Sequence, residues 1–198
     1  MSAKSFKNVF LLFAIFFVLL GILYPIAVTG VAKLIFPYQA SGSLYELDGK
    51  IVGSKLICQP VSDPALFWPR PSSTASYPCN PLSSGGSNVG PTNKQLVENI
   101  ESRIKILNSY GLEAPFPSDM VMGSGSGLEP YISLENAVMQ ARRVSKYANI
   151  PYEKLLKMIY KNTDERTFGI FGAKRVNVVK LNMELLEWKK KDRFQKVY

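Results

Sequence analysis

VFLLFAIFFVLLGIL, residues 9–23, decides the fold class of this chain, because almost every side chain in it is apolar. Thirteen of these residues are Phe, Leu, Ile or Val, and no charged residue occurs between positions 8 and 32. Those thirteen side chains contribute about −4 to −8 kcal/mol to membrane insertion. As a helix, residues 8–32 would span about 37 Å, more than the roughly 30 Å hydrocarbon core of a bilayer. The stretch therefore predicts one transmembrane helix, with everything beyond residue 36 outside the bilayer.

A cleaved signal peptide is the alternative interpretation, since Lys4 and Lys7 would form its basic start. The apolar region of a signal peptide is about 7–15 residues long and ends in a small-residue cleavage site. Here the apolar character continues through Val28, Val31 and Leu34 without a clean A-x-A pattern. We therefore favour a retained membrane anchor.

The flanks of this helix predict its orientation. Lys4 and Lys7 lie in a short segment before the helix, and such basic residues stay in the cytoplasm. The basic charge of the longer remainder does not reverse this, because long domains are translocated largely regardless of charge. We expect a cytoplasmic N-terminus and an outer C-terminal domain. Pro25 removes one backbone hydrogen bond inside the predicted helix and should bend it.

The composition excludes several kinds of site. The chain has 198 residues, a net charge of +9 and no histidine, so it lacks the usual general base and the commonest metal ligand. Its two cysteines, Cys58 and Cys79, do not form a C-x-x-C motif, which argues against zinc. Outside the cytoplasm they could form a disulfide instead. Basic residues are spread along the chain rather than interleaved with aromatics, which, with the anchor, argues against nucleic acid. No catalytic, cofactor-binding or metal site is predicted.

Hydrophobic periodicity predicts a mixed domain after the anchor. Asp48-Gly49 lies between two short apolar runs and is typical of a hairpin turn. Spacings of three and four residues predict helices over 92–110, 134–148 and 151–162, and short apolar runs predict strands over 168–171 and 176–181. Residues 61–91 hold six of the thirteen prolines, but the aromatic residues Phe67, Trp68 and Tyr77 within them look buried and favour an ordered, irregular loop.

These elements predict an α+β fold: one N-terminal transmembrane helix followed by a single mixed extracytoplasmic domain. The predicted parts are a cytoplasmic tail (1–7), the transmembrane helix with its interface (8–36), the α+β domain (37–186) and a basic tail (187–198).

Glycine-rich motifs in the domain are weak signals for chemistry. GSGSG at 123–127 is followed by Leu-Glu-Pro where a Walker loop needs Gly-Lys-Ser/Thr, so we interpret it as a structural turn. There is no G-x-S-x-G motif and no histidine for a serine nucleophile. The chain therefore reads as a membrane-anchored, non-enzymatic outer domain.

Six residues are candidates for contact with a partner protein. Glycines let a backbone approach another surface closely, and short polar side chains offer hydrogen bonds to it. Five of the candidates lie in the loop SGGSNVGPTN (84–93). The alternative to a partner contact is that this loop only caps the helix that follows it and folds back on the domain. An arginine could pair with a partner's carboxylate, or be an ordinary surface residue. The candidates are Arg70, Gly85, Gly86, Ser87, Asn88 and Gly90.

Six sequence blocks occur in order: LYPIAVTG (23–30), DGKIVGSKLICQ (48–59), RPSSTASY (70–77), SGGSNVGPTN (84–93), GSGSGLEPYIS (123–133) and VNVVKLN (176–182). Together they resemble the C-subunit family of the Kdp potassium-transporting P-type ATPases, over about residues 20–185. Two departures stand out. The family usually has aspartate and then histidine in the block that here reads Glu129-Pro130-Tyr131, and often glycine where Cys58 stands. No role of that histidine carries over to Tyr131.

The resemblance implies a non-catalytic accessory subunit, a "catalytic chaperone", of an ATP-driven high-affinity potassium uptake pump. The implied partners are a channel-like potassium-binding subunit, a P-type ATPase subunit that hydrolyses ATP, and a small single-span subunit. The implied complex uses ATP, Mg²⁺ and K⁺, although we expect none of them bound directly by this chain, and it lies in a bacterial or archaeal cell (inner) membrane. The resemblance also implies that the subunit improves ATP binding by the pump. Our predicted orientation argues against direct contact with ATP, because it places the domain across the membrane from cytoplasmic ATP. An anchored serine hydrolase or a free-standing binding protein is the alternative function.

Overall fold

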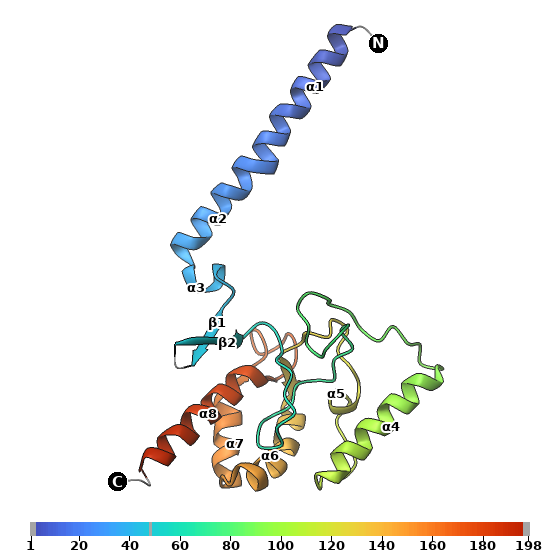
Figure 1. Ribbon diagram of the computed structural model, residues 1–198, viewed down its shortest axis with the longest axis vertical. Helices are drawn as coiled ribbons and strands as arrows, with labels where there is room; N and C mark the ends of the chain where they lie inside the picture. Colours follow the sequence, from blue (N-terminus) through green and yellow to red (C-terminus); the bar gives the residue numbers. More distant parts are fainter. Residues whose placement is uncertain (1–2, 48, 196–198) are drawn as a thin grey trace. The chain divides into compact units, whose positions relative to one another are not determined.

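A computed structural model describes residues 3–47 and 49–195, and the side chains of 5–47 and 49–190. The chain divides into two units, which meet between Leu44 and Tyr45. The first unit is helical, and the second is a mixed helix and sheet domain (Figure 1). The predicted fold class is therefore confirmed: one N-terminal apolar helix is followed by an α+β domain.

The first unit contains one helix that is long and apolar enough to cross a membrane, Ser5–Ile35, among the described residues. Its parts are α1 (Ala3–Val18), a π-helical turn (Leu19–Leu23) and α2 (Tyr24–Ile35), and the short helix α3 (Pro37–Ala40) follows. Large apolar side chains along it are exposed, as a helix requires if lipid or other helices are to surround it. Its retention in the mature protein stays a prediction.

Pro25 explains the π-helical turn. A proline inside a helix lacks an N–H donor, and its ring collides with the carbonyl group four residues earlier. Here the N–H group of Tyr24 bonds to the carbonyl oxygen of Leu19, five residues back. The wider turn lies just before Pro25 and gives the backbone another hydrogen-bonding pattern at that point.

The second unit contains two small sheets. The predicted hairpin is confirmed as β1 (Leu44–Leu47) and β2 (Lys50–Ser54), which pair with each other, although Asp48 of the turn lies outside the described residues. The other sheet has the order β3-β5-β4, with antiparallel pairing throughout. Its strands are β3 (Tyr131–Ser133), β4 (Thr163–Asp164) and β5 (Arg175–Asn177).

Helices supply most of the core of the second unit. They are α4 (Lys94–Ser109), α5 (Ser118–Val121), α6 (Leu134–Ala148), α7 (Tyr152–Lys161) and α8 (Val178–Gln195). Figure 1 shows α4 apart from α6, α7 and α8. The main core joins side chains of α6, α7, α8 and the sheet; its fully buried members include Val144, Leu155, Ile159, Val176, Leu181 and Leu185. The three predicted helices are thus confirmed: the bounds of α6 are as predicted, and the ends of α4 and α7 differ by one or two residues.

Local capping explains where two of these helices begin and end. Ser133 accepts a hydrogen bond from the N–H group of Asn136 and starts α6, while Asn149 at φ 55° ends it in the left-handed conformation. Asn93 caps α4 in the same manner, and Gly111 at φ 78° follows its end.

Two predicted strands are wrong. The strand predicted over 176–181 ends at Asn177, because the Oδ1 atom of Asn177 accepts the N–H group of Lys180 and caps α8. The strand predicted over 168–171 is a turn instead. Helix α8 continues through Gln195, so the basic segment predicted as a tail from residue 187 is helical up to that residue. Residues 196–198 lie outside the described part.

Candidate functional site

The proline-rich segment 61–91 is held on the domain by side chains of α6 and α8. The N–H group of Phe67 donates to Oδ1 of Asn182 (2.8 Å), and Nδ2 of Asn182 donates to the carbonyl oxygen of Phe67 (2.8 Å). The next residue is held in the same way, since Trp68 exchanges two hydrogen bonds with the side-chain amide of Gln140. Phe67 itself is fully buried. The prediction that Phe67 and Trp68 order this loop is confirmed, but the burial expected for Tyr77 is wrong, because that side chain is 48% exposed.

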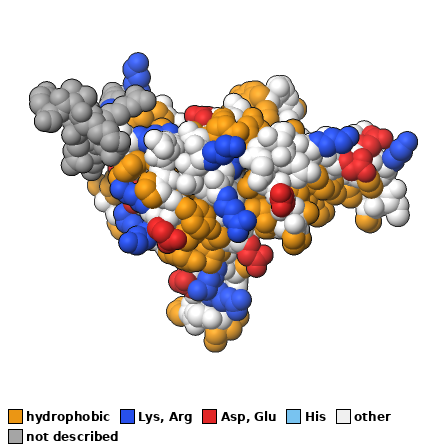
Figure 2. Space-filling model, turned by 90° about the horizontal axis from the view of Figure 1, so that it is seen from below, with side chains coloured by type: hydrophobic (Ala, Val, Ile, Leu, Met, Phe, Trp, Pro, Cys, Tyr) orange, Lys and Arg blue, Asp and Glu red, His pale blue; other side chains and the backbone are white. Residues whose placement is uncertain are grey.

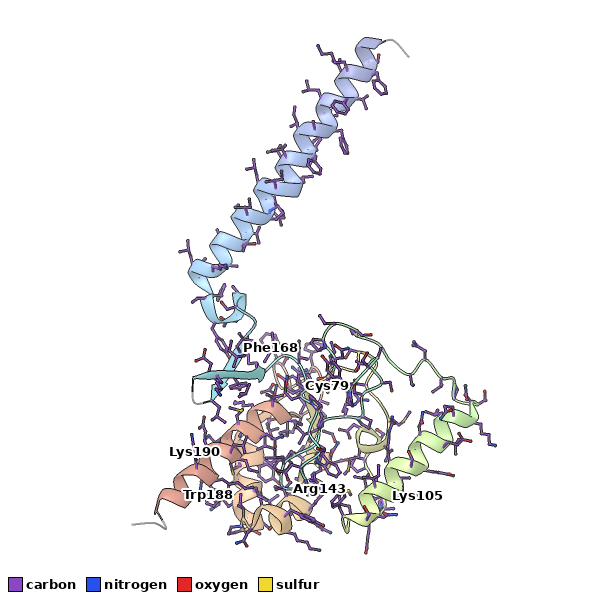
Figure 3. All side chains as sticks on the ribbon, viewed as in Figure 1. Cys79, Lys105, Arg143, Phe168, Trp188 and Lys190 are labelled. Carbon is purple, nitrogen blue, oxygen red and sulfur yellow. A yellow bond between two sulfur atoms is a disulfide. The ribbon has the colours of Figure 1, made fainter. Side chains whose placement is uncertain are left out.

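A buried arginine completes this attachment. The guanidinium group of Arg143 donates to the carbonyl oxygens of Pro64 and Leu66 (2.5 and 3.0 Å) and to Oε1 of Gln140 (2.7 Å). It also lies 3.7 Å from the ring centroid of Trp68. Burial lowers the pKa of Arg143 to about 10, so the group is still charged at neutral pH. Figure 3 labels it within the domain.

Sequence reasoning missed this polar network. Asn136, Gln140 and Arg143 lie on the same face of α6 as the apolar side chains, at spacings of three and four residues. Polar residues on the buried face of an amphipathic helix are unusual, and this pattern was the available signal. Its effect is to fix the irregular loop without regular backbone pairing.

The candidate loop 84–93 contacts the GSGSG turn of the same chain at one end. The N–H group of Gly85 and the hydroxyl group of Ser84 both donate to the carbonyl oxygen of Ser126 (2.9 and 3.1 Å). A Cβ atom on Gly86 would lie 3.0 Å from the carbonyl oxygen of Gly125. These two candidate glycines therefore meet the protein's own backbone.

The part of the same loop from Ser87 to Gly90 is more exposed than Gly85 and Gly86. Ser87, Asn88 and Gly90 are exposed, and Asn88 adopts the left-handed conformation at φ 52°. Asparagine tolerates that conformation better than most residues, which explains its use here. A partner protein could reach these three residues without displacing any described contact of the domain.

Arg70 lies between two cavities of the domain. Its Nη2 atom donates to the carbonyl oxygen of Gly123 (3.3 Å), and its side chain is half-buried. One cavity of about 570 Å³ is lined by residues that include Trp68, Pro71 and Arg103. A second cavity of about 350 Å³ is lined by residues that include Glu129. Arg70, predicted to contact a partner, therefore uses one of its guanidinium nitrogens for a hydrogen bond within the chain.

Two of the three acidic side chains that line the second cavity, Asp119 and Glu129, already have hydrogen-bond partners. Asp119 accepts hydrogen bonds from the backbone and hydroxyl groups of Ser133 and from Nδ2 of Asn136. Glu129 accepts the N–H group of Tyr131, whose ring lies 4.1 Å from the guanidinium carbon of Arg175. Within the described ranges, no group of three or more His, Cys, Asp or Glu side chains could hold a metal ion. The hydrogen bonds of Asp119 and Glu129 therefore hold the segments around the second cavity in place.

Cys58 and Cys79 form a disulfide in the structure, with Cα atoms 5.6 Å apart. Both are buried, and the bond connects the segment after β2 to the middle of the proline-rich loop. The predicted structural turn at 123–127 adjoins it, since the N–H group of Cys58 donates to the carbonyl oxygen of Leu128. The loops 58–59, 70–86 and 123–128 therefore form one connected surface region.

Comparison with known proteins shows what this chain, with a candidate membrane span and an α+β domain, is similar to. The family model "K+-transporting ATPase, c chain" matches residues 6–187, which include the apolar helix and nearly all of the domain. This chain belongs to the KdpC family. Its match covers both structural units, so the family includes the apolar helix as well as the domain.

Individual relatives agree over the same length. A protein of Geotalea uraniireducens is 43% identical over 183 residues, 92% of this chain and 97% of the relative. One of Methylococcus capsulatus is 45% identical over 92% of this chain and 97% of its own. One of Polaromonas naphthalenivorans is 46% identical over 88% of this chain and 90% of its own. Each carries the name potassium-transporting ATPase KdpC subunit.

Proposed function

We propose that this chain is a non-catalytic accessory subunit of an ATP-driven potassium uptake pump, and that it supports the assembly and activity of the complex. The observation that carries the proposal is the match of family and relatives over both units, in a chain with one apolar helix and a loop-rich domain. The buried polar side chains described above support a non-catalytic role, because they form hydrogen bonds that hold loops of the domain in place.

The partners that we propose are a channel-like potassium-binding subunit, a P-type subunit that hydrolyses ATP, and a small single-span subunit. The helix Ser5–Ile35 would pack beside their helices. With Lys7 on the cytoplasmic side, the domain would face outward. ATP and Mg²⁺ would then act on the P-type subunit on the other side of the membrane, and this chain would influence them only through its partners.

Affinity purification tests the proposed membership of the complex. The tagged chain is expressed with its native neighbours, solubilised in mild detergent and purified. We expect two large membrane proteins in the eluate, and potassium-stimulated ATPase activity that is lost when this chain is deleted. Recovery of this chain alone would contradict the proposal. A stoichiometric serine adduct with an activated phosphonate would favour a hydrolase instead.

Orientation needs a separate test, because the native cysteines are buried and joined. Ser87→Cys introduces a thiol in the exposed part of the candidate loop. A membrane-impermeant maleimide should label it in intact cells. Labelling that requires cell lysis would place the domain in the cytoplasm and refute the proposed topology.

A further inference from the structure

A protruding hairpin tip, residues 166–172 between β4 and β5, gathers exposed apolar side chains. Phe168, Ile170 and Phe171 are 88%, 73% and 66% exposed. Figure 3 labels Phe168 at the outside of the domain. A single exposed apolar side chain is ordinary, but three within four residues form a concentrated patch that is typical of an interaction site.

The backbone of the hairpin tip has a fixed shape. Thr167 and Phe171 exchange two backbone hydrogen bonds (2.9 and 3.0 Å), and the N–H group of Gly169 donates to the carbonyl oxygen of Arg166 (3.0 Å). Phe168 and Gly169 both have positive φ angles, 54° and 75°. A left-handed conformation is uncommon for a bulky residue such as phenylalanine, and such local strain concentrates at functional positions. The tip therefore presents its three apolar side chains in a defined geometry.

The charges at the base of the hairpin tip largely cancel. Lys174 pairs with Glu165 (Nζ to Oε1, 3.0 Å), and Arg175 lies 3.9 Å from Asp164 (Nε to Oδ2). With Arg166, these five residues have a net charge of only +1 (three basic minus two acidic). Segments that bind anionic lipid usually carry several unpaired basic residues beside their apolar ones. The pairing therefore favours an uncharged protein surface over lipid headgroups.

The location of the partner follows from the chain itself. Nine residues (36–44) separate the end of α2 at Ile35 from the start of the second unit at Tyr45, and the ten Cα-to-Cα steps between these two residues span at most about 35 Å. A hydrogen bond from Nδ2 of Asn177 to the carbonyl oxygen of Lys55 (2.8 Å) joins strand β5 to the segment that leaves β2. A domain tethered in this way meets proteins of the same membrane at high effective concentration.

We infer that the hairpin tip inserts Phe168, Ile170 and Phe171 into an apolar, uncharged pocket on the outer face of another membrane subunit of the same complex. A fluid bilayer does not require a particular shape of the segment that enters it. A protein pocket binds a preorganised segment more tightly, because less conformational entropy is lost on binding. The inference rests on the proposed function, because it requires that such a subunit accompanies this chain.

Site-specific photo-crosslinking in the assembled complex tests the inference. The photoreactive amino acid benzoylphenylalanine replaces Phe168, and, in a matched control, Leu82, which is 92% exposed in another loop. Cells that express all subunits are irradiated, and adducts of the tagged chain are identified by mass spectrometry. We expect an adduct between position 168 and a larger membrane protein, in at least about tenfold greater yield than at position 82.

Other outcomes overturn the inference. An adduct only with phospholipid would assign the tip to the bilayer, an adduct with a second copy of this chain would assign it to self-association, and no adduct would leave it in water. Equal yields at positions 168 and 82 would remove its specificity. If no large subunit co-purifies at all, the proposed function fails as well; co-purification without a crosslink at position 168 overturns the inference alone.

A substitution pair gives a second readout. Ile170→Ser removes an apolar side chain that is 73% exposed, so the fold should tolerate it. We expect about tenfold weaker retention of the chain in the purified complex, while Leu82→Ser retains it like the wild type. An unchanged retention of Ile170→Ser would contradict the inference.

Discussion

The side-chain amide of Asn182 makes two hydrogen bonds to the backbone of Phe67, its N–H donor and its carbonyl oxygen, across 115 positions of sequence. The amide thus pairs with Phe67 much as a neighbouring strand would. The ring of Phe67 also belongs to the main core. The irregular loop and helix α8 are therefore joined by polar and apolar contacts at the same residue.

Asn182→Ala should strongly destabilise the domain. The substitution leaves two backbone groups of Phe67 without partners in a buried place, and each unsatisfied group costs about 1–3 kcal/mol. We expect the free energy of unfolding to fall by about 2–4 kcal/mol in urea titrations of the detergent-solubilised chain. Asn108→Ala, at an exposed position of α4, is the control and should change it little. Equal effects of both would disprove the role assigned to Asn182.

Gly127→Ala should prevent the GSGSG turn from packing. Gly127 has φ 68°, and an added Cβ atom would lie 2.5 Å from Cγ2 of Thr74 and 2.7 Å from the carbonyl oxygen of Gly85. Strain and overlap together should cost about 2–4 kcal/mol. Gly125→Ala is the matched control, because nothing lies within 4 Å of its Cβ position. Thermal melting of both variants would show a large loss for the first alone.

The disulfide between Cys58 and Cys79 should be present in the protein purified from cells. Alkylation after denaturation without reductant should then label no cysteine, and reduction should label both. Closing this loop stabilises the fold by about 3 kcal/mol in the chain-entropy model. We therefore also expect a lower melting temperature after reduction. Two free thiols in unreduced protein would contradict the prediction.

The exposed part of the candidate loop should serve assembly. Asn88→Gly removes a side chain while keeping the left-handed backbone possible, whereas Asn88→Leu adds strain and bulk at φ 52°. If a partner contacts this side chain, both variants should lower recovery of the complex or its potassium-stimulated ATPase activity. The glycine variant should leave the chain's own melting temperature nearly unchanged. A loss of stability in the glycine variant, with full assembly, would mean that the loop is internal scaffolding.

The ion pair of Glu184 should make stability depend on acidity. Burial raises the pKa of Glu184, but hydrogen bonds from Lys161 (2.7 Å) and Asn162 (2.6 Å) outweigh it and lower the pKa below its usual value of 4.5. The folded state thus binds this proton less readily than the unfolded state. Its stabilising contribution is complete above about pH 4.5 and is lost as the pH falls through the lower pKa of the folded protein.

Glu184→Gln tests this dependence. The pair is partly exposed, so the variant should be only about 0.5–1 kcal/mol less stable at neutral pH, and the difference should shrink in acid. Glu187→Gln, at an exposed position of the same helix, is the control. Urea titrations from pH 3 to 7 provide the measurement. A difference that does not change with pH would rule out the carboxylate as its source.

The sequence by itself determined the elements whose signals are local. The apolar run around residues 9–23 gave the candidate membrane span, and three- and four-residue hydrophobic spacing gave α4 and α6. The order of six motifs gave the family before any geometry was known. Such features depend on neighbours within a few residues, so pattern and propensity are enough to find them.

Only the tertiary structure decided the course of the proline-rich loop and the contacts of its candidate residues. Phe67 is fixed by Asn182 and by α6, Gly86 by the carbonyl group of Gly125, and neither contact has a local periodicity. The same reason explains the wrong strand over 176–181, because the side chain of Asn177 caps a helix where its neighbours' β-branched side chains indicate a strand. Hydrogen bonds between distant segments overrule local propensity here, and they become visible only when those segments are in place.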